Sequence, residues 1–238
     1  TITHEQFQKI TEYLKKKKSS SLLAIQISYY AGLRIGEVAG LSWSDVNLEE
    51  QHLTIRRSLN RNSTRHKLEL GATKSNKVRI VDFGDTLAEI LRKAKKEQLK
   101  QRLQYGELYK RNYYKEVKEK NRIHYELYSL DGTQEVPEDY KEISLVCVRK
   151  DGMYLGTDAL SNMCSSIAKH VKGLEHFHFH LLRHTFTSNL LASGAPPKDV
   201  QEFLGHSAVS TTMNIYAHAT REAKRNSVRL LDKVAGND

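Results

Sequence analysis

The sequence predicts an α+β fold that is mainly helical and carries a small antiparallel sheet. Two observations predict this class. Apolar residues recur at helical spacing in several segments near both ends of the chain. Between them, "HLTIRRSL" and "KVRIVDF" alternate with a period of two, as half-buried strands do. A chain of 238 residues is also long enough to bury a sizeable core.

The N-terminal helices have recognisable ends. Thr3 and Gln6 have the spacing of a capping box, which places the start of the first helix at Thr3. Its apolar stripe continues to the lysine run at 15–18. A second helix is predicted over "SLLAIQISYYAG" and stops at Gly32. "RIGEVAG" adds a further helical turn or two, and a polar, glycine-containing connection joins the two predicted strands.

The second half of the chain is predicted to return to helix. Residues 86 to about 120 are heavily charged, and we expect them to be helical. "RIHYELY" and "EISLVCV" are expected to pair as strands across an acidic turn region. Helical periodicity resumes from about Asp158, and Gly194 ends the helix "HLLRHTFTSNLLASG". Further helices are predicted over "PKDVQEFLG" and "REAKRNSVRLLDKV".

The charge balance favours a polyanionic partner. Lys and Arg total 38 against 28 Asp and Glu, a net charge of +10. An excess of this size is typical of proteins that bind nucleic acid or an anionic membrane surface, although a basic enzyme without such a partner is the alternative. No apolar run approaches the roughly 20 residues that span a bilayer. With two cysteines, no disulfide framework is expected. We therefore expect a cytoplasmic location. From the first residues we expect no signal peptide, and from the missing initiator Met we expect a fragment or processed chain.

The segment "GLRIGE" is a candidate anion site. Gly32 ends one predicted helix, and Arg34 lies near the start of the next, where backbone N–H groups are free. A guanidinium and a helix N-terminus both favour phosphate oxygens. The alternative is an ordinary surface pair between Arg34 and Glu37, which are three residues apart.

The stretch "EHFHFHLLRH", residues 175–184, suggests a metal site at first sight. A structural zinc site needs a closed set of about four ligands, and neither cysteine is spaced to contribute. His176 and His178 alternate with Phe177 and Phe179, so we expect the phenylalanines to point into the core and the two histidines to face solvent or a ligand.

The helix that follows carries a different combination. His180 and Arg183 are three residues apart and are expected to share a helix face. Arginine binds phosphate through two parallel hydrogen bonds, and histidine transfers protons near neutral pH. His184 lies further round the helix, and a packing role is expected for it.

The segment "LGHSAVSTTMNIYAH" contains a candidate nucleophile. His206 follows a helix-ending glycine, and Tyr216 comes ten residues later. A tyrosine with an ordinary pKa near 10 is a poor nucleophile until a neighbouring base or cations help it to ionise. Taken alone, one tyrosine among twelve is more often a packing or surface residue.

Together these segments resemble the tyrosine recombinases, or phage-type integrases. "GLRIGE", "TKS", "HLLRHT", "LGHS" and "STTMNIYAH" match that family's motifs in order, over nearly the whole chain. One such motif is weak evidence, but all of them in order are specific. "FHFHLLRHT", "PKDVQEFLGH" and "NYYKEVKEKNRIHYELY" are most similar to integrases of bacterial conjugative transposons.

The resemblance implies a site-specific DNA recombinase that cleaves and rejoins DNA through a 3′-phosphotyrosyl intermediate, and so integrates and excises a mobile element. Arg34 and Arg183 are then expected to hold the scissile phosphate, and His206 to donate another hydrogen bond to it. His180 is expected to handle the tyrosine proton, and Tyr216 to attack phosphorus.

The remaining roles also follow from the resemblance. Lys74 matches the general acid that protonates the departing 5′-oxygen, and Glu37 matches an acidic residue that supports Arg34. Lys77 occupies a position where the family often has Ser or Thr, so Lys77 is an alternative candidate for the general acid. No cofactor and no metal are expected, because phosphodiester exchange needs mainly positioning and preorganised positive charge. Consistent with this, the sequence has no P-loop and no acidic cluster able to hold two metals.

Double-stranded DNA is the expected partner, bound chiefly through phosphates. The candidate surfaces are the 15–18 run, the tyrosine- and lysine-rich segment near 105–115, and a set of cations around the predicted strands: Arg56, Arg57, Arg61, Arg65, Lys67 and Lys77. The charged segment near 105–115 is equally well explained as a solvated helix whose tyrosines pack on the body.

The resemblance also implies a domain organisation. Residues 1–238 correspond to the catalytic domain, with a helical or β-hairpin insertion at about 96–148 and a tail helix at about 220–235. The family's N-terminal arm-binding and core-binding domains are expected to be absent from this chain. The apolar side of the tail helix either packs on its own domain or docks on a neighbour in a DNA-bound tetramer. The expected location is the bacterial cytoplasm, on the nucleoid.

Three other functions compete with this interpretation. A type IB topoisomerase uses a similar set of residues to relax supercoils. A DNA-binding regulator without catalysis is disfavoured because every expected catalytic position is filled. A metal-dependent nuclease is the most distant alternative.

Overall fold

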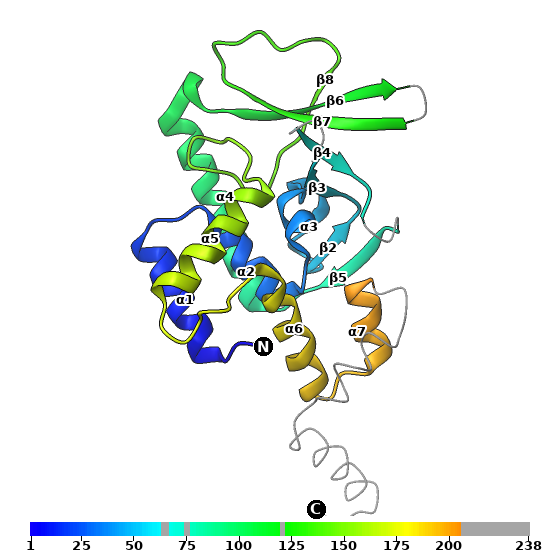
Figure 1. The fold of residues 1–238 in the computed structure, drawn as a ribbon. Helices are drawn as coiled ribbons and strands as arrows, with labels where there is room; N and C mark the ends of the chain where they lie inside the picture. Colours follow the sequence, from blue (N-terminus) through cyan, green and yellow to red (C-terminus); the bar gives the residue numbers. More distant parts are fainter. Residues whose placement is uncertain (63–66, 74–76, 120–121, 206–238) are drawn as a thin grey trace, which may run out of the picture.

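The computed structural model describes residues 1–62, 67–73, 77–119 and 122–205. In this part of the chain most helices gather on one side and the strands on the other, with the two shortest α-helices beside the strands (Figure 1). The α-helices are α1 (His4–Lys16), α2 (Ser21–Ala31), α3 (Ile35–Ala39), α4 (Asp85–Tyr105), α5 (Thr157–His170), α6 (Phe179–Ala192) and α7 (Pro197–Leu204), with short 3-10 helices at Trp43–Asp45 and Gly106–Leu108. None of the helices in the described segments has the length and apolar character needed to cross a bilayer.

The ends of the first two helices are as predicted. The Thr3 side chain accepts a hydrogen bond from the Gln6 backbone N–H at 3.1 Å, and the Gln6 side chain accepts one from the Thr3 N–H at 2.8 Å. Helix α2 ends at Gly32, which has a left-handed φ of 65°. A side chain at this position would collide with Phe186, because a Cβ built there lies 2.4 Å from the ring. Gly32 therefore allows α2 and α6 to pack closely.

The strands form two antiparallel sheets rather than the single sheet that was predicted. The smaller sheet has the order β1-β2-β5, with β1 at Val46–Asn47, β2 at His52–Ile55 and β5 at Arg79–Asp82. The larger sheet has the order β3-β4-β7-β6-β8, with strands at Ser58–Arg61, Leu68–Gly71, Arg122–Leu130, Arg111–Glu119 and Tyr140–Glu142. "HLTIRRSL" is thus split between the two sheets, and Arg56 and Arg57 form the corner between β2 and β3.

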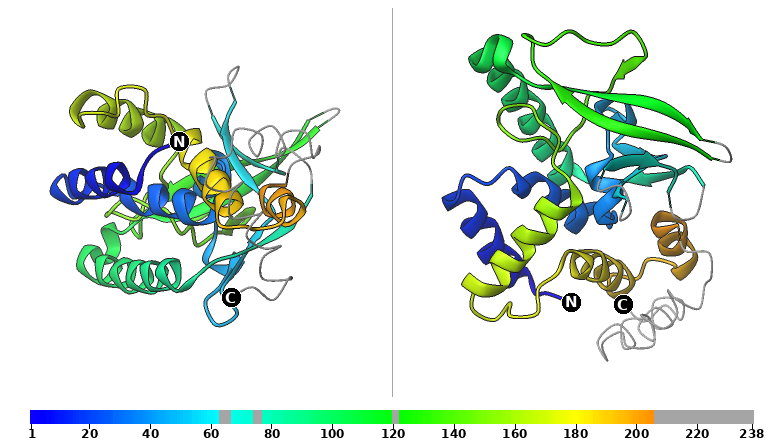
Figure 2. Two further views of the ribbon diagram at one scale, coloured as in Figure 1. Left: turned by 90° about the horizontal axis from the view of Figure 1, so that it is seen from below. Right: turned by 45° about the horizontal axis from the view of Figure 1, so that its top comes forward.

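The predicted helix from 86 to about 120 is wrong in its second half. Helix α4 ends at Tyr105, and Gly106 follows it with a φ of 54°. Residues 111–119 form strand β6, which pairs with β7 along its whole length, from Arg111 opposite Leu130 to Glu119 opposite Arg122. The β6–β7 hairpin crosses over the end of the body, next to the C-terminal end of α4 (Figure 2). Strands β6, β7 and β8 all lie within the predicted insertion at 96–148.

The predicted pairing of "RIHYELY" with "EISLVCV" is also wrong. The first segment lies in β7, whose neighbours are β4 and β6. Strand β8 at the start of the second segment pairs with β6, and beyond it only single bridges occur, Ser42 to Leu145 and Val148 to Tyr154. Residues 143–148 instead supply buried side chains to the main core, including Leu145, Val146 and Cys147. These residues are apolar because they are buried. A short apolar run is equally typical of a buried strand and of an irregular core segment, so the sequence did not distinguish the two.

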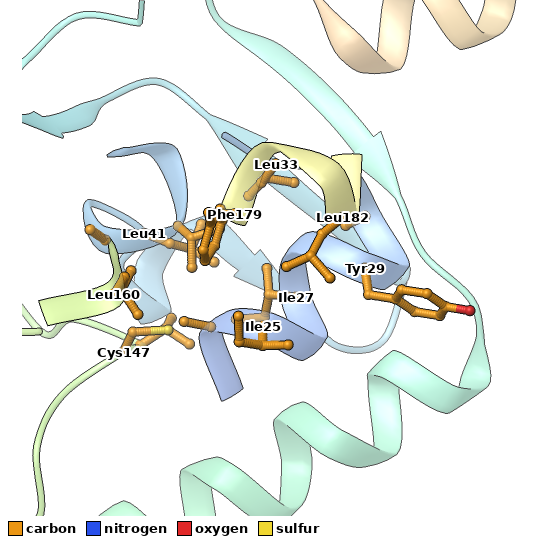
Figure 3. Packing of buried hydrophobic residues seen from close by; sticks show 14 of the residues in the cluster. Ile25, Ile27, Tyr29, Leu33, Leu41, Cys147, Leu160, Phe179 and Leu182 are labelled. Atoms are coloured by element: carbon orange, nitrogen blue, oxygen red, sulfur yellow. The ribbon is translucent and has the colours of Figure 1, made fainter. Parts of the chain in front are cut away.

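The main core lies between the helices and the buried sides of the two sheets. Figure 3 shows part of it, with Ile25 and Ile27 of α2 facing Phe179 and Leu182 of α6. As predicted, Phe177 and Phe179 are buried, and His176 and His178 are exposed. A separate small cluster joins the end of α6 to α7 through Leu191, Val200 and Leu204. Because α2 and α6 pack together, the residues just after α2 lie beside the first turns of α6.

Candidate active site

Arg183 lies at the centre of the candidate site and is almost completely buried. It belongs to α6, and 2% of its surface is exposed. Its Nη1 donates a hydrogen bond to the Gly32 carbonyl at 2.7 Å, and its Nη2 donates one to the Leu204 carbonyl at 2.6 Å. Burial, followed by the nearby Arg34, lowers the pKa of Arg183 to about 9, so the group is still cationic at neutral pH. Arg183 thus links the end of α2 to the end of α7.

Arg34 reaches the same place from the N-terminus of α3. Its backbone N–H donates to Glu37 Oε2 at 2.9 Å, and its Nη1 donates to Glu37 Oε1 at 3.0 Å. The same Nη1 also approaches the Leu204 carbonyl at 3.4 Å. The pair between Arg34 and Glu37 therefore exists, but it is not an ordinary surface pair, because the Glu37 side chain is only 1% exposed. The Arg34 side chain keeps 24% of its surface open to solvent.

Glu37 is a buried carboxylate that is held by two arginines. In addition to Arg34, Arg79 of β5 donates from Nη1 to Oε1 at 2.9 Å and from Nη2 to Oε2 at 2.8 Å. Burial by itself would raise the pKa of Glu37, but the hydrogen bonds and charges of Arg79 and Arg34 outweigh it and lower the pKa. Glu37 is therefore ionised at neutral pH, and it offsets part of the positive charge of the site.

Three guanidinium groups meet at the C-terminal end of α7. Arg34 and Arg183 approach the Leu204 carbonyl, and Arg79 Nε donates to the Phe203 carbonyl at 2.8 Å. The last carbonyls of a helix lack partners within the helix and carry partial negative charge, so cations stabilise them. With Glu37 as the acidic partner, these three arginines leave a local excess of positive charge that suits an anion such as a phosphodiester.

His180 lies in the first turn of α6, with its ring edge-to-face against His184 at a centroid distance of 4.6 Å. The residue keeps an exposed surface. Burial of the rest of the ring, followed by the charges of His184, Arg183 and Arg34, lowers the pKa of His180 to about 4. The imidazole is therefore neutral at neutral pH and can accept a proton.

We expect the His180 imidazole of the DNA-free chain to titrate near pH 4, and this can be measured by NMR from its ring carbon shifts. The His180→Gln variant identifies its signal. Because the folded pKa lies below the unfolded value of 6.5, only the unfolded chain binds this proton between the two values. Its contribution to the free energy of unfolding is thus absent above pH 6.5 and becomes unfavourable as the pH falls toward 4. A titration midpoint at or above pH 6 would contradict the assigned surroundings of His180.

The predicted site residues fall into two groups. The structure brings Arg34, Glu37 and Arg183 together, with His180 at the start of the same helix as Arg183. Lys74, His206 and Tyr216 lie outside the described residues. Lys77 is exposed, and its carbonyl accepts a hydrogen bond from the Thr73 hydroxyl at 3.0 Å. The assignment of the general acid to Lys74 or Lys77 thus stays a prediction.

Most of the candidate DNA-binding cations form ion pairs with acidic residues. Arg56 and Arg57 both bind the buried Asp45, at 2.9 and 3.1 Å. Arg61 pairs with Asp158, and Lys67 pairs with Glu126 at 2.7 Å. Arg65 lies outside the described residues. These ion pairs neutralise part of the charge that was assigned to a DNA-binding surface, although the side chains of Arg56, Arg61 and Lys67 stay about half exposed.

Sequence reasoning missed Arg79. The sequence predicts only that Arg79 lies in the strand "KVRIVDF", although it contacts both Glu37 and the end of α7. One signal was present, since Arg79 and Val81 alternate with Ile80 and Asp82, which places the arginine on the inward side of the strand. An inward arginine on a short strand indicates a buried acidic partner.

Comparison with known proteins places this chain in one class, the tyrosine recombinases. The phage integrase family model matches residues 1–223. A XerC-like tyrosine recombinase of Caldanaerobacter subterraneus subsp. tengcongensis is 26% identical over 240 residues, covering 98% of this chain and 54% of that protein. The transposase from transposon Tn916 of Enterococcus faecalis is 28% identical over 239 residues, covering 98% of this chain and 51% of that protein. The chain belongs to the phage integrase family.

Solved structures confirm the α+β fold of this class. A variant of the Tn1549 transposon integrase, in complex with transposon right end DNA, matches with a TM-score of 0.67 at 21% identity, over 97% of this chain and 65% of that one. The catalytic domain of bacteriophage HP1 integrase matches with a TM-score of 0.51 at 17% identity, over 100% of this chain and 97% of that one. The chain spans about half the length of the curated relatives named above.

Proposed function

We propose that this chain is the catalytic domain of a site-specific recombinase that integrates and excises a mobile element of the conjugative transposon type. The observation that carries the proposal is the convergence of Arg34 and Arg183 on the end of α7, immediately before His206 in the sequence. Two arginines from segments far apart in the sequence meet in one place, beside a neutral histidine. The similarity to the Tn916 transposase supports the choice of element.

In the proposed reaction the Tyr216 oxygen attacks the scissile phosphorus, and the bond from phosphorus to the 5′-oxygen breaks. The tyrosine proton passes to His180, which is neutral before the reaction. The departing 5′-oxygen takes a proton from Lys74 or Lys77. Arg34 and Arg183 stabilise the charge on the equatorial oxygens of the transition state. Rejoining is the same exchange with a 5′-hydroxyl as nucleophile, so the phosphodiester energy is conserved and no ATP is needed.

The proposed organisation has three parts. The catalytic domain covers residues 1–238, and its insertion at about 96–148 contains the β6–β7 hairpin. The tail helix at about 220–235, outside the described residues, is proposed to dock on a neighbouring protomer and to link activity to a tetramer on DNA. The proposed reaction takes place on the bacterial nucleoid, in the cytoplasm. The DNA complexes of the Tn1549 integrase support double-stranded DNA as the substrate.

Covalent capture tests the proposal. The chain is incubated in EDTA with a pool of duplexes that carry a randomised core and a single nick, which releases the cleaved end and traps the adduct. We expect an SDS-stable protein–DNA adduct that is lost in Tyr216→Phe. Tyr13→Phe is the control, because this tyrosine on α1 hydrogen bonds to Ser166 at 2.9 Å and takes no part in the proposed reaction. Sequencing the trapped DNA then identifies the site.

Each outcome discriminates between the candidate functions. Cleavage that appears only when Mg²⁺ replaces EDTA, without an adduct, indicates a nuclease. Binding without an adduct under either condition indicates a regulator, and either result contradicts the proposal. An adduct without strand exchange between two selected duplexes indicates a topoisomerase-like activity. The mass of the trapped complexes tests assembly, since one protomer per paired duplex would contradict the tetramer.

A further inference from the structure

Arg79 has contacts on two sides of the candidate site. Its Nη1 and Nη2 donate to both oxygens of Glu37, at 2.9 and 2.8 Å, and its Nε donates to the Phe203 carbonyl at 2.8 Å. Three donors of one guanidinium are thus used in two directions. Because Nε, Nη1 and Nη2 all donate to protein acceptors, the Arg79 guanidinium is committed to contacts within the protein. Its effect on the reaction must therefore pass through its neighbours.

The first neighbour is Glu37, which in turn holds Arg34. Arg34 binds Glu37 through its backbone N–H and through Nη1, on the same two oxygens that Arg79 contacts. Because the fork of Arg79 fixes the plane of the carboxylate, it also fixes the direction from which Arg34 can approach. A shift of Glu37 would move the guanidinium that is proposed to hold the phosphate.

The second neighbour is the turn that ends α7. Gly205 has a left-handed φ of 61°, and a Cβ built there lies 3.0 Å from Arg79 Cδ and 3.3 Å from its Nε and Nη1. The turn thus packs directly against the Arg79 side chain while Phe203 accepts its hydrogen bond. His206 is the next residue in the sequence. Arg79 is therefore in contact with the residue that directly precedes a proposed phosphate ligand.

We infer that Arg79 is a positioning residue: through Glu37 it fixes the direction of the Arg34 guanidinium, and through Phe203 and Gly205 it holds the turn that ends α7. The inference rests on the proposed function. Lysine cannot take over this role of Arg79. Its ammonium keeps the positive charge that pairs with Glu37, but it lacks the planar pair of donors for the carboxylate and the Nε donor for the Phe203 carbonyl.

The test is the Arg79→Lys variant in single-turnover cleavage of the selected nicked duplex at saturating protein. Misplacement of catalytic groups by about 1 Å costs on the order of a hundredfold in rate, so we expect the rate constant to fall about 30- to 100-fold. The amplitude should stay complete, and the DNA affinity should change less than about threefold, since the three guanidinium nitrogens of Arg79 donate to protein acceptors. Arg92→Lys is the control, because this exposed arginine of α4 donates to the Leu48 carbonyl, which follows β1, at 3.2 Å.

Rate constant and amplitude separate positioning from stability. A residue that only stabilises the fold changes the fraction of active protein, and hence the amplitude, while its rate constant stays that of the parent. An Arg79→Lys variant with the parental rate constant, or with a reduced amplitude alone, would overturn the inference. A parent chain that binds the duplex without forming an adduct contradicts the proposed function instead.

A second pair of variants covers the case in which Arg79→Lys does not fold. Gly205→Ala places a methyl group against Arg79, whereas Gly194→Ala meets no atom within 4 Å, and both glycines have positive φ, 61° and 91°. Both variants place an alanine at a positive φ, but only the alanine at position 205 contacts Arg79. We expect Gly205→Ala to lower the rate constant at least tenfold more than Gly194→Ala does. Equal rate constants for the two would overturn the inference.

Discussion

Replacing Arg183 by lysine is expected to lower the rate of covalent DNA cleavage by about a thousandfold, the upper range for loss of one preorganised donor in an active site. The guanidinium of Arg183 bonds to the carbonyls of Gly32 and Leu204 on opposite sides. These two contacts hold the group in place before DNA arrives. A lysine ammonium cannot reach both carbonyls and also present a planar pair of donors to a phosphate.

The rate constant for adduct formation on the selected nicked duplex, measured in a single turnover, checks this expectation. Arg149→Lys is the matched control, because Arg149 is exposed and its guanidinium contacts only the Met153 sulfur at 3.7 Å among the interactions described. Its rate constant should equal that of the parent. A loss of less than about tenfold for Arg183→Lys would show that charge alone suffices, contrary to the bidentate role.

Replacing Glu37 by glutamine should destabilise the chain by about 3–5 kcal/mol, the usual cost of breaking a buried ion pair by removing one partner. The carboxylate accepts four hydrogen bonds from Arg34 and Arg79. An amide keeps the shape but turns one acceptor into a donor that faces a guanidinium. Two arginines are then left without their anion in a buried site, and both the free energy of unfolding and the placement of Arg34 suffer.

Urea denaturation at several pH values measures this effect and tests its sign. Because the folded pKa of Glu37 lies below its ordinary value, its contribution is fully present above pH 4.5 and is lost as the pH falls through the folded pKa. The difference between parent and Glu37→Gln should therefore be largest near neutral pH and shrink in acid. Glu89→Gln is the control, since its exposed pair with Lys93 at 3.6 Å should contribute less than about 0.5 kcal/mol. A similar loss in both variants would contradict the buried role of Glu37.

Sequence patterns predicted the structure correctly where it depends on residues that are close together in the chain. The capping box at Thr3, the helix end at Gly32 and the burial of Phe177 and Phe179 are all confirmed. Each depends on a few residues along the chain and on backbone geometry that those residues fix. The helix prediction for 111–119 failed for the opposite reason. Its tyrosines and charges suit either structure, and the pairing partner β7, which follows in the chain, stabilises the strand.

The sequence by itself determined the mainly helical α+β class, the family and the order of its motifs, including Arg34, Glu37, His180 and Arg183. Only the tertiary structure showed that Arg79 belongs with them, that Arg183 is buried between two backbone carbonyls, and that the pKa of His180 is lowered. The physical reason is common to all three. Burial, charge and hydrogen-bond partners at this site come from α2, α3, β5, α6 and α7, and they act together only when packing brings these distant segments within contact.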